Sequence, residues 1–253
     1  MNDSDFLTHV TERLASLSMV AAVMLGGSRS VGTQRPDSDW DFAVYYRGAF
    51  NPQEIRELGW KGEVSALGGW GGGVFNGGAW LQVDGRSVDI HYRDLESIDY
   101  EMREAAAGRF RIEPLMFHLA GIPTYLVIAE LALGRMLVGA LPHPAYPARL
   151  RERAPKVWWE RADRLFAYAK TNYAAQSQFA PCVGMVVQAS CNAAHGVLAD
   201  RGEWVTNEKS LLARANLVKL DQIISAAQPS AAKLEEMVNQ ARELCSAAFT
   251  ISE

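Results

Sequence analysis

The chain has 253 residues, of which 49% are hydrophobic, and its formal net charge is −4 at pH 7. This length allows one large domain or two modest ones, each with a proper core. The mild acidity disfavours a nucleic-acid partner, because duplex binders carry a strong basic excess, but it leaves a nucleotide substrate open.

Cysteine usage and the apolar runs indicate a cytoplasmic protein without a membrane span. The cysteines are odd in number and lack CxxC spacing, which favours buried free thiols in a reducing compartment; they are Cys182, Cys191 and Cys245. The start of the chain, "MNDSDFLTHVTERL", is too polar for a signal peptide. Glycine, proline and glutamate interrupt the apolar run near 119–133, so we expect a buried helix there.

The first 60 residues alternate between helical and strand patterns. Residues 5–18 place apolar side chains on one helical stripe, and the apolar run 20–25 predicts a buried strand that ends at Gly26-Gly27. In the strand predicted over 39–46, core residues alternate with Asp39 and Asp41 on the opposite face. Capping and stop residues predict a short helix over 51–59.

A glycine-rich stretch and a hairpin follow. Residues 68–78 contain seven glycines and predict a loop or a loosely packed strand pair, without the Lys-Ser/Thr ending of a P-loop. The alternating runs within 79–92 meet at Asp84-Gly85, a favoured two-residue turn. On the second of these strands, Asp89 lies on the face opposite the core.

From residue 94 onward the pattern is mainly helical. The proline-rich stretch 139–147 is the best domain boundary, and we expect a first domain over 1–143 and a helical domain over 144–253. Helical segments are expected in the second domain near 149–175, 182–200, 207–214 and 230–248. The predicted fold class is therefore α+β, with a small mixed sheet and flanking helices followed by a helical bundle.

Three aspartates carry the chemistry that we predict. Asp39 and Asp41 share one strand face, and a neighbouring strand with Asp89 would bring three carboxylates together. Such a cluster repels itself unless a cation neutralises it, and hard oxygen ligands suit Mg²⁺. Because Mg²⁺ completes its shell with water and substrate phosphates, the cluster predicts a phosphorylated substrate.

The Gly26-Gly27-Ser28 turn offers a complementary phosphate site. Glycine lets the backbone approach a phosphate closely, and successive N–H groups with a serine hydroxyl form an anion-binding concavity. Arg29 and Arg35 are nearby candidates for charge contacts to the phosphates.

"LGGSRSVG" followed by "SDWDF", with a third acid in "VDIHY", resembles the signature of the DNA polymerase β-like nucleotidyltransferase superfamily. The layout of the whole chain is similar to bacterial aminoglycoside and lincosamide nucleotidyltransferases. The resemblance implies that Asp39 and Asp41 bind metal and that Asp89 binds metal or activates the acceptor hydroxyl. It also implies that nucleotide contacts come from the glycine turn and the helical domain; these residues are Gly27, Ser28, Arg29, Ser38 and Lys209.

The resemblance implies a Mg²⁺-dependent transferase that moves a nucleoside monophosphate, with AMP expected, from an NTP such as ATP to a hydroxyl of a small molecule. An antibiotic of the aminoglycoside or lincosamide type is one acceptor class. Two alternatives stay open: an antitoxin-type enzyme that attaches AMP to a protein, and a catalytically silent nucleotide-binding module. The acceptor, the preferred NTP and the oligomeric state are left open by the sequence.

Overall fold

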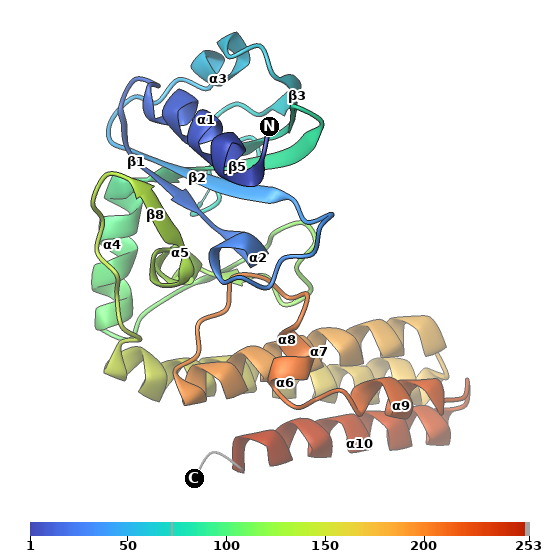
Figure 1. Cartoon of the computed structure of the whole chain (residues 1–253). Helices are drawn as coiled ribbons and strands as arrows, with labels where there is room; N and C mark the ends of the chain where they lie inside the picture. Colours follow the sequence, from blue (N-terminus) through green and yellow to red (C-terminus); the bar gives the residue numbers. More distant parts are fainter. Residues whose placement is uncertain (72, 251–253) are drawn as a thin grey trace. The chain divides into compact units, whose positions relative to one another are not determined.

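The computed structural model describes residues 1–71 and 73–250 (Figure 1). The chain divides into two compact units. The first unit comprises Met1–Arg103 and Thr124–Ala145, and the second comprises Glu104–Pro123 and the chain from Tyr146 onward. The α+β fold class, a mixed sheet followed by a helical region, is confirmed. The predicted boundary after residue 143 stays a prediction, and the units differ from it in assigning Glu104–Pro123 to the helical part.

One mixed sheet forms the centre of the first unit. Within the described residues its strand order is β3-β4-β5-β2-β1-β8, and only the central pair, β2 with β5, is parallel. The strands are β1 (Val20–Leu25), β2 (Trp40–Tyr46), β3 (Lys61–Val64), β4 (Gly78–Val83), β5 (Arg86–Asp94) and β8 (Arg135–Val138). The strands near 20–25 and 39–46 and the hairpin within 79–92 are confirmed, whereas β3 and β8 were not predicted.

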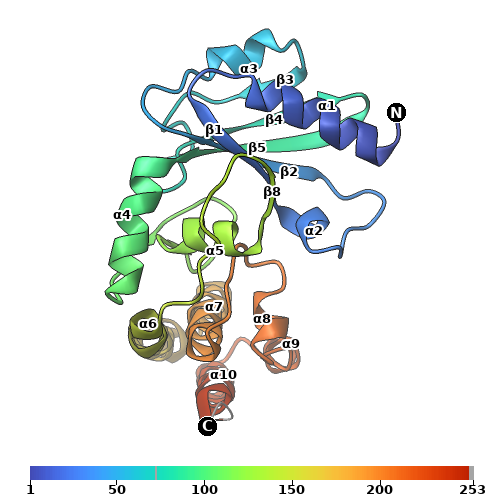
Figure 2. The ribbon, with the colours of Figure 1, turned by 60° about the vertical axis from the view of Figure 1, so that its left-hand side comes forward.

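Helices α1 (Asp3–Ala15) and α3 (Gln53–Glu57) cover one face of this sheet (Figure 2). The covered face carries alternate strand residues, and these pack with the apolar stripe of α1, which holds Phe6, Val10 and Leu14. Trp40 and Phe42 belong to this core, so the intervening Asp41 lies on the other face, as its alternation predicts. The core therefore fixes the register that exposes the aspartates.

The hairpin turn has the conformation that its residues favour. Asp84 and Gly85 have φ values of 48° and 75°, and both are left-handed, as a type I′ turn requires. This turn sets the register between β4 and β5, in which Trp80 lies opposite Asp89. A one-residue shift would move Asp89 to the core face, so the turn helps to position the candidate site.

The second face of the sheet is partly covered by helix α5 (Leu126–Leu133), which carries Glu130. Arg93 on β5 is buried and donates to both carboxylate oxygens of Glu130, at 2.5 Å from Nε and 2.7 Å from Nη2. Burial alone would raise the pKa of Glu130, but the charge and hydrogen bonds of Arg93 outweigh it and, with His91, lower the pKa to about 2. This pair ties α5 to the sheet.

We predict that Glu130→Gln costs about 2 kcal/mol of unfolding free energy at pH 7, because the buried Arg93 loses its charged partner. The folded-state pKa of Glu130 is depressed, so its contribution is present above pH 4.5 and is lost as the pH falls toward 2. Urea unfolding at several pH values measures this difference. A gap between variant and wild type that stays constant from pH 7 to pH 3 would contradict the assignment.

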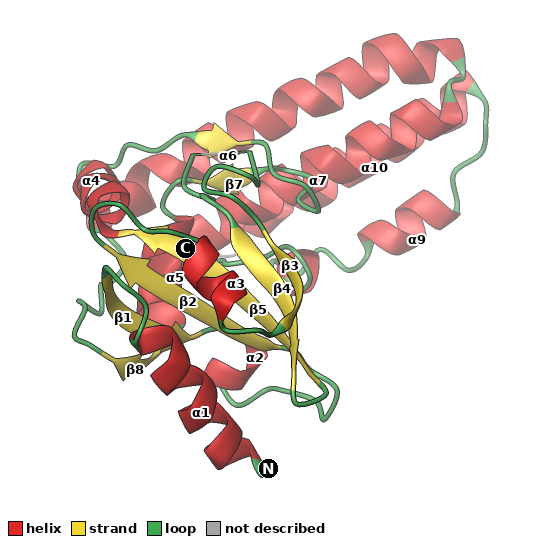
Figure 3. Cartoon of the chain, turned by 90° about the horizontal axis from the view of Figure 1, so that it is seen from above, coloured by secondary structure: helices red, strands yellow, loops and turns green. Residues whose placement is uncertain are grey.

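Three long helices dominate the second unit and run along one another (Figure 3). They are α6 (Ala148–Tyr168), α7 (Phe179–Arg201) and α10 (Ala231–Thr250), and short helices α8 (Leu211–Arg214) and α9 (Leu220–Ser225) precede α10. By length and composition α7 could cross a membrane, but 72% of its apolar window is buried within the structure, as in the core helix of a bundle. The predicted buried free thiols are confirmed at all three cysteines.

The remaining elements are short helices, strands and turns. Helix α4 (Leu95–Ala106) follows β5, and a two-stranded ladder pairs β6 (Ile112–Glu113) with β7 (Ile122–Pro123). A π-helical turn (Ala169–Tyr173) and a 3-10 turn (Ala174–Gln176) extend α6. The predicted helical character of 94–138 was wrong at β6, β7 and β8.

Candidate functional site

Asp41 and Asp89 lie side by side on the second face of the sheet. They are direct partners in the parallel pairing of β2 with β5. Adjacent strands are about 4.8 Å apart, and directly paired residues project from the same face, so both carboxylates emerge at one place. Both residues are partly exposed. The structure thus brings together two of the three predicted carboxylates.

The glycine turn lies directly against Asp41. Helix α2 (Gly27–Ser30) is a single turn that follows β1, and the backbone N–H of Gly26 donates to the carbonyl oxygen of Asp41 at 2.8 Å. Gly27 has a φ of 59°, and a Cβ atom there would lie 1.8 Å from Oδ2 of Asp41. The carboxylate therefore occupies the space that any side chain at 27 would fill. The predicted neighbourhood of the glycine turn and the aspartates is present in the structure.

Arg29 has a different environment from the one we predicted. Its guanidinium group donates to the carbonyl oxygens of Ser38 and Asp39, at 2.8 Å and 3.2 Å. It also lies 4.1 Å from the ring centre of Trp40, and only 9% of the side chain is exposed. Its donors thus engage carbonyl groups of the loop before β2, and the predicted phosphate contact of Arg29 stays a prediction.

Asp39 and Ser38 lie in that loop. Asp39 precedes the first residue of β2 and is exposed, and Ser38 accepts a hydrogen bond on Oγ from the backbone N–H of Arg35 at 2.9 Å. Arg35 itself is exposed and paired with Asp37. The loop therefore has its own hydrogen bonds, and the predicted nucleotide contact of Ser38 stays a prediction.

The Asp41 and Asp89 carboxylates are the candidate ligands for a divalent cation. Among residues 1–71 and 73–250, no group of three or more His, Cys, Asp or Glu side chains is placed to hold an ion. Strand pairing aligns Asp41 with Asp89, whereas Asp39 precedes the first residue of β2, so the convergence of all three carboxylates stays a prediction. The in-register pair still fits Mg²⁺, which commonly takes one or two carboxylates and completes its shell with water and phosphate oxygens.

Lys209, the predicted contact from the helical domain, lies in the second unit. We expected it in the first turn of a helix that starts near 207, but α8 begins only at Leu211. Lys209 instead sits in a turn, where its backbone N–H donates to the side-chain oxygen of Asn207 at 3.0 Å. The turn arises because Asn207 bonds its own backbone two residues on. The role of Lys209 toward a nucleotide stays a prediction.

The same segment of the second unit also contains a buried acid. Glu208 accepts hydrogen bonds from the backbone N–H groups of Leu119 and Ala120 at 2.6 Å and 3.0 Å, and lies 3.5 Å from His195. Burial would raise the pKa of Glu208, but these partners lower it. His195 is itself buried and stacks on the buried ring of Trp158, as a core residue of the helical unit does.

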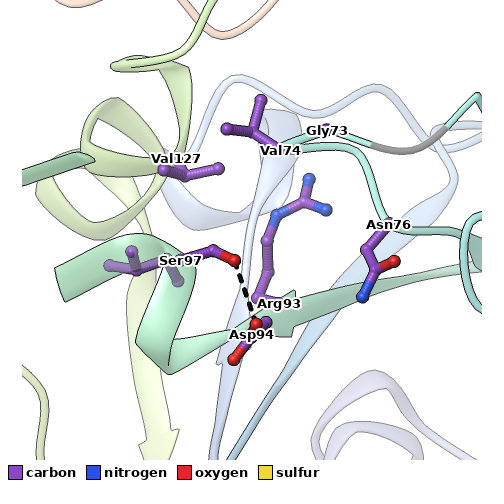
Figure 4. Close-up of a pocket in the computed structure, with 8 residues that line it drawn as sticks. Gly73, Val74, Asn76, Arg93, Asp94, Ser97 and Val127 are labelled. Carbon is purple, nitrogen blue, oxygen red and sulfur yellow. Dashed lines mark hydrogen bonds between the residues drawn. The ribbon is translucent and has the colours of Figure 1, made fainter. Parts of the chain in front are cut away.

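The first unit contains a small cavity whose lining includes Arg93, Asp94 and Ser97 (Figure 4). It opens beside Arg93, where the hydroxyl of Ser97 donates to Asp94 at 2.9 Å, and its other lining residues include Val74 and Asn76. Asp94 is five residues along β5 from Asp89, a separation of about 16 Å at the usual rise of a strand. The cavity is thus a separate feature from the candidate site.

Sequence reasoning missed two residues beside the site. Trp80 is paired directly with Asp89 across β4 and β5, and Glu63 is paired with Trp80 across β3 and β4. Trp80 is 41% exposed, which is high for the largest apolar side chain. The alternation of "GAWLQV" could have placed Trp80 on the face of Asp89, but β3 has no clear pattern in the sequence.

Residues 7–70 match the family model described as a nucleotidyltransferase domain, and this segment contains the glycine turn, Asp39 and Asp41. A search of curated proteins finds no match. A nucleotidyltransferase-like protein from Exiguobacterium sibiricum is 11% identical, with a TM-score of 0.44, and the match covers 98% of this chain and 74% of that one. Spectinomycin adenyltransferase AAD(9) from Enterococcus faecialis, solved with ATP and spectinomycin, is also 11% identical, with a TM-score of 0.40 and coverage of 97% and 100%. Over residues 7–70 the chain is therefore similar to nucleotidyltransferase domains, as its glycine turn and aspartates predict.

Proposed function

We propose that this protein transfers a nucleoside monophosphate, with AMP expected, from an NTP to a hydroxyl group of a small molecule. The observation that carries the proposal is the in-register pairing of Asp41 with Asp89, with the backbone of Gly27 against the Asp41 carboxylate. A paired acid site beside a close backbone turn suits a triphosphate and its metal. The family match to the segment that contains this turn supports the same reaction class.

Asp41 and Asp89, with Asp39 from the adjoining loop, would hold Mg²⁺. When bound, the ion neutralises phosphate charge and helps to orient the attacking and leaving oxygens. Asp89 accepts the proton of the acceptor hydroxyl, whose oxygen then forms a bond to the α-phosphorus. The bond from the α-phosphorus to the bridging oxygen breaks, and pyrophosphate leaves toward the N–H groups and hydroxyl of Gly27 and Ser28.

The acceptor that we propose is a small hydroxylated compound, with aminoglycoside or lincosamide antibiotics as the first classes to test. The resemblance in layout noted from the sequence suggests these classes, and the mild negative charge of the chain suits a cationic acceptor better than a nucleic acid. Antibiotic resistance and a cytoplasmic location are parts of the same proposal.

Pyrophosphate release tests the function directly. We expect release only when Mg²⁺, an NTP and a suitable acceptor are all present, and we expect EDTA to abolish it. The assay should run each of the four NTPs against a panel of hydroxylated acceptors. ATP binding by calorimetry without pyrophosphate release across the whole panel would contradict a transferase and favour the nucleotide-binding module.

We predict that Arg29→Lys lowers kcat/KM for transfer about 10-fold and raises the Mg²⁺ concentration needed for half-maximal rate. A lysine cannot donate to two carbonyl groups while it stacks on Trp40, so the loop that carries Asp39 loses its anchor. Arg35→Lys is the matched control, because that side chain is 80% exposed, and it should leave both values unchanged. An unchanged Mg²⁺ requirement in Arg29→Lys would show that Arg29 has a structural role alone.

A further inference from the structure

A transverse row of side chains crosses four strands at the candidate site. From β2 outward the row contains Asp41, Asp89, Trp80 and Glu63, each paired directly with the next. Directly paired residues project from the same face of a sheet. An exposed tryptophan therefore lies between two carboxylates, on the side of Asp89 that is remote from Asp41.

A second tryptophan enlarges this aromatic surface. Trp70 stacks on Trp80 with ring centres 4.9 Å apart and an interplanar angle of 23°. Its ring lies directly over Gly78, since a Cβ atom there would be only 2.3 Å from the ring, and its edge faces His91 at 5.8 Å. Trp70 is thus packed on the sheet against Trp80, while Trp80 itself stays 41% exposed.

The order of residues in the row indicates whether the Trp80 surface faces the nucleotide or the acceptor. The glycine turn that would take the leaving pyrophosphate lies beside Asp41, at the end of the row that is farther from Trp80. In phosphoryl transfer the attacking and leaving oxygens lie roughly in line through the phosphorus. The attacking acceptor therefore approaches from the Trp80 side, and the nucleotide phosphates lie on the other.

The charges beside Trp80 indicate what kind of acceptor fits. Glu63 and Asp89 flank the ring in the same row, while Lys61 lies in the adjacent row, opposite Gln82. The face of a tryptophan attracts cations, and more strongly where neighbouring carboxylates add to the field. Rings also stack well on an indole, because they bury apolar area without losing conformational freedom.

We propose that Trp80, supported by Trp70 and flanked by Glu63, is the specificity-determining surface for the acceptor and selects a ring that carries positive charge. This inference rests on the proposed function for the direction from which the acceptor approaches. The binding of a cationic ring to Trp80 can nevertheless be measured without turnover.

The first experiment is calorimetric binding without NTP, with kanamycin as the cationic ring-bearing probe and fully N-acetylated kanamycin as its uncharged counterpart. We expect the wild type to bind kanamycin at least 10-fold more tightly than the acetylated compound. Trp80→Ala should weaken kanamycin binding about 10-fold, and Trp80→Phe should restore most of it. Tyr100→Ala removes a similarly exposed aromatic ring (46%) elsewhere in the first unit and should change nothing. No kanamycin binding by the wild type, or equal binding of both compounds, overturns the proposal.

Kinetics separate this inference from the proposed function. With an acceptor that supports pyrophosphate release, Trp80→Ala should raise the acceptor KM about 10-fold and leave the KM for the NTP unchanged. If Trp80→Ala still releases pyrophosphate with an unchanged KM for the acceptor, or with a raised KM for the NTP instead, the assignment of Trp80 to the acceptor is wrong. The proposed transferase activity would stand in either case. If kanamycin binding depends on Trp80 as expected but no acceptor releases pyrophosphate, the surface stands as a binding site and the transferase fails.

Discussion

Asp41→Asn is expected to lower nucleotidyl transfer by about 10³- to 10⁴-fold, because it removes one of two in-register carboxylates that we assign to Mg²⁺. The fold should survive, because asparagine has the same shape and relieves repulsion between neighbouring acids, which is worth up to about 1 kcal/mol. Pyrophosphate release gives the activity, and thermal melting gives the stability, with Tm expected within about 3 °C of the wild type.

Asp37→Asn is the matched control for this prediction. Asp37 lies in the same loop region, is exposed and pairs with the exposed Arg35, so its loss should leave transfer unchanged. Full activity in Asp41→Asn would remove the metal assignment. A loss of activity together with a large fall in Tm would instead assign Asp41 a structural role, because the charge would then be needed for folding.

The parts of the site that follow from alternation could be predicted from the sequence. Trp40 and Phe42 are strong core residues, so Asp41 had to face away from them, and Val88 and Ile90 do the same for Asp89. The Asp84-Gly85 turn then fixed the hairpin. Local patterns of this kind are reliable because burial penalises every alternative register.

The parts that depend on long-range contacts could not be predicted. Arg29 looked like a phosphate contact because it is a cation beside a glycine turn, and only the folded loop reveals that the carbonyl groups of Ser38 and Asp39 engage it. Asp39 appeared to continue the strand, but β2 begins one residue later. Trp80 was counted as a hairpin residue, and its place beside Asp89 follows from cross-strand register alone.

In the helical half, too, local patterns predicted some features and long-range contacts determined others. Long amphipathic or apolar segments were predicted close to their observed ends, whereas the expected helix near 207 is shorter by several residues. Where that helix was expected to begin, the side chain of Asn207 accepts from the N–H of Lys209 and closes a turn instead of capping a helix. Such competition between a cap and a turn depends on what packs around the segment, and here Glu208 is drawn inward by the backbone of Leu119 and Ala120.

Gly27→Ala is expected to lower transfer about 100-fold or more with a modest loss of stability. The added Cβ atom would lie 1.8 Å from Oδ2 and 2.6 Å from Cγ of Asp41, so the carboxylate must move away from its present position. The positive φ of 59° adds a backbone cost of about 1 kcal/mol for a residue with a side chain. Pyrophosphate release and urea unfolding measure the two effects separately.

Gly32→Ala separates the two causes. Gly32 has a φ of 74°, so alanine there carries a similar backbone cost, but nothing lies within 4 Å of the added atom. Its transfer rate should stay within about 3-fold of the wild type while its unfolding free energy falls by about the same 1 kcal/mol. Equal losses of activity in both variants would mean that backbone strain in this turn, and not the approach of Gly27 to Asp41, sets the rate. A loss confined to Gly27→Ala would mean that the glycine is needed to leave room for the carboxylate, and the position of Asp41 would then be the feature that the turn preserves.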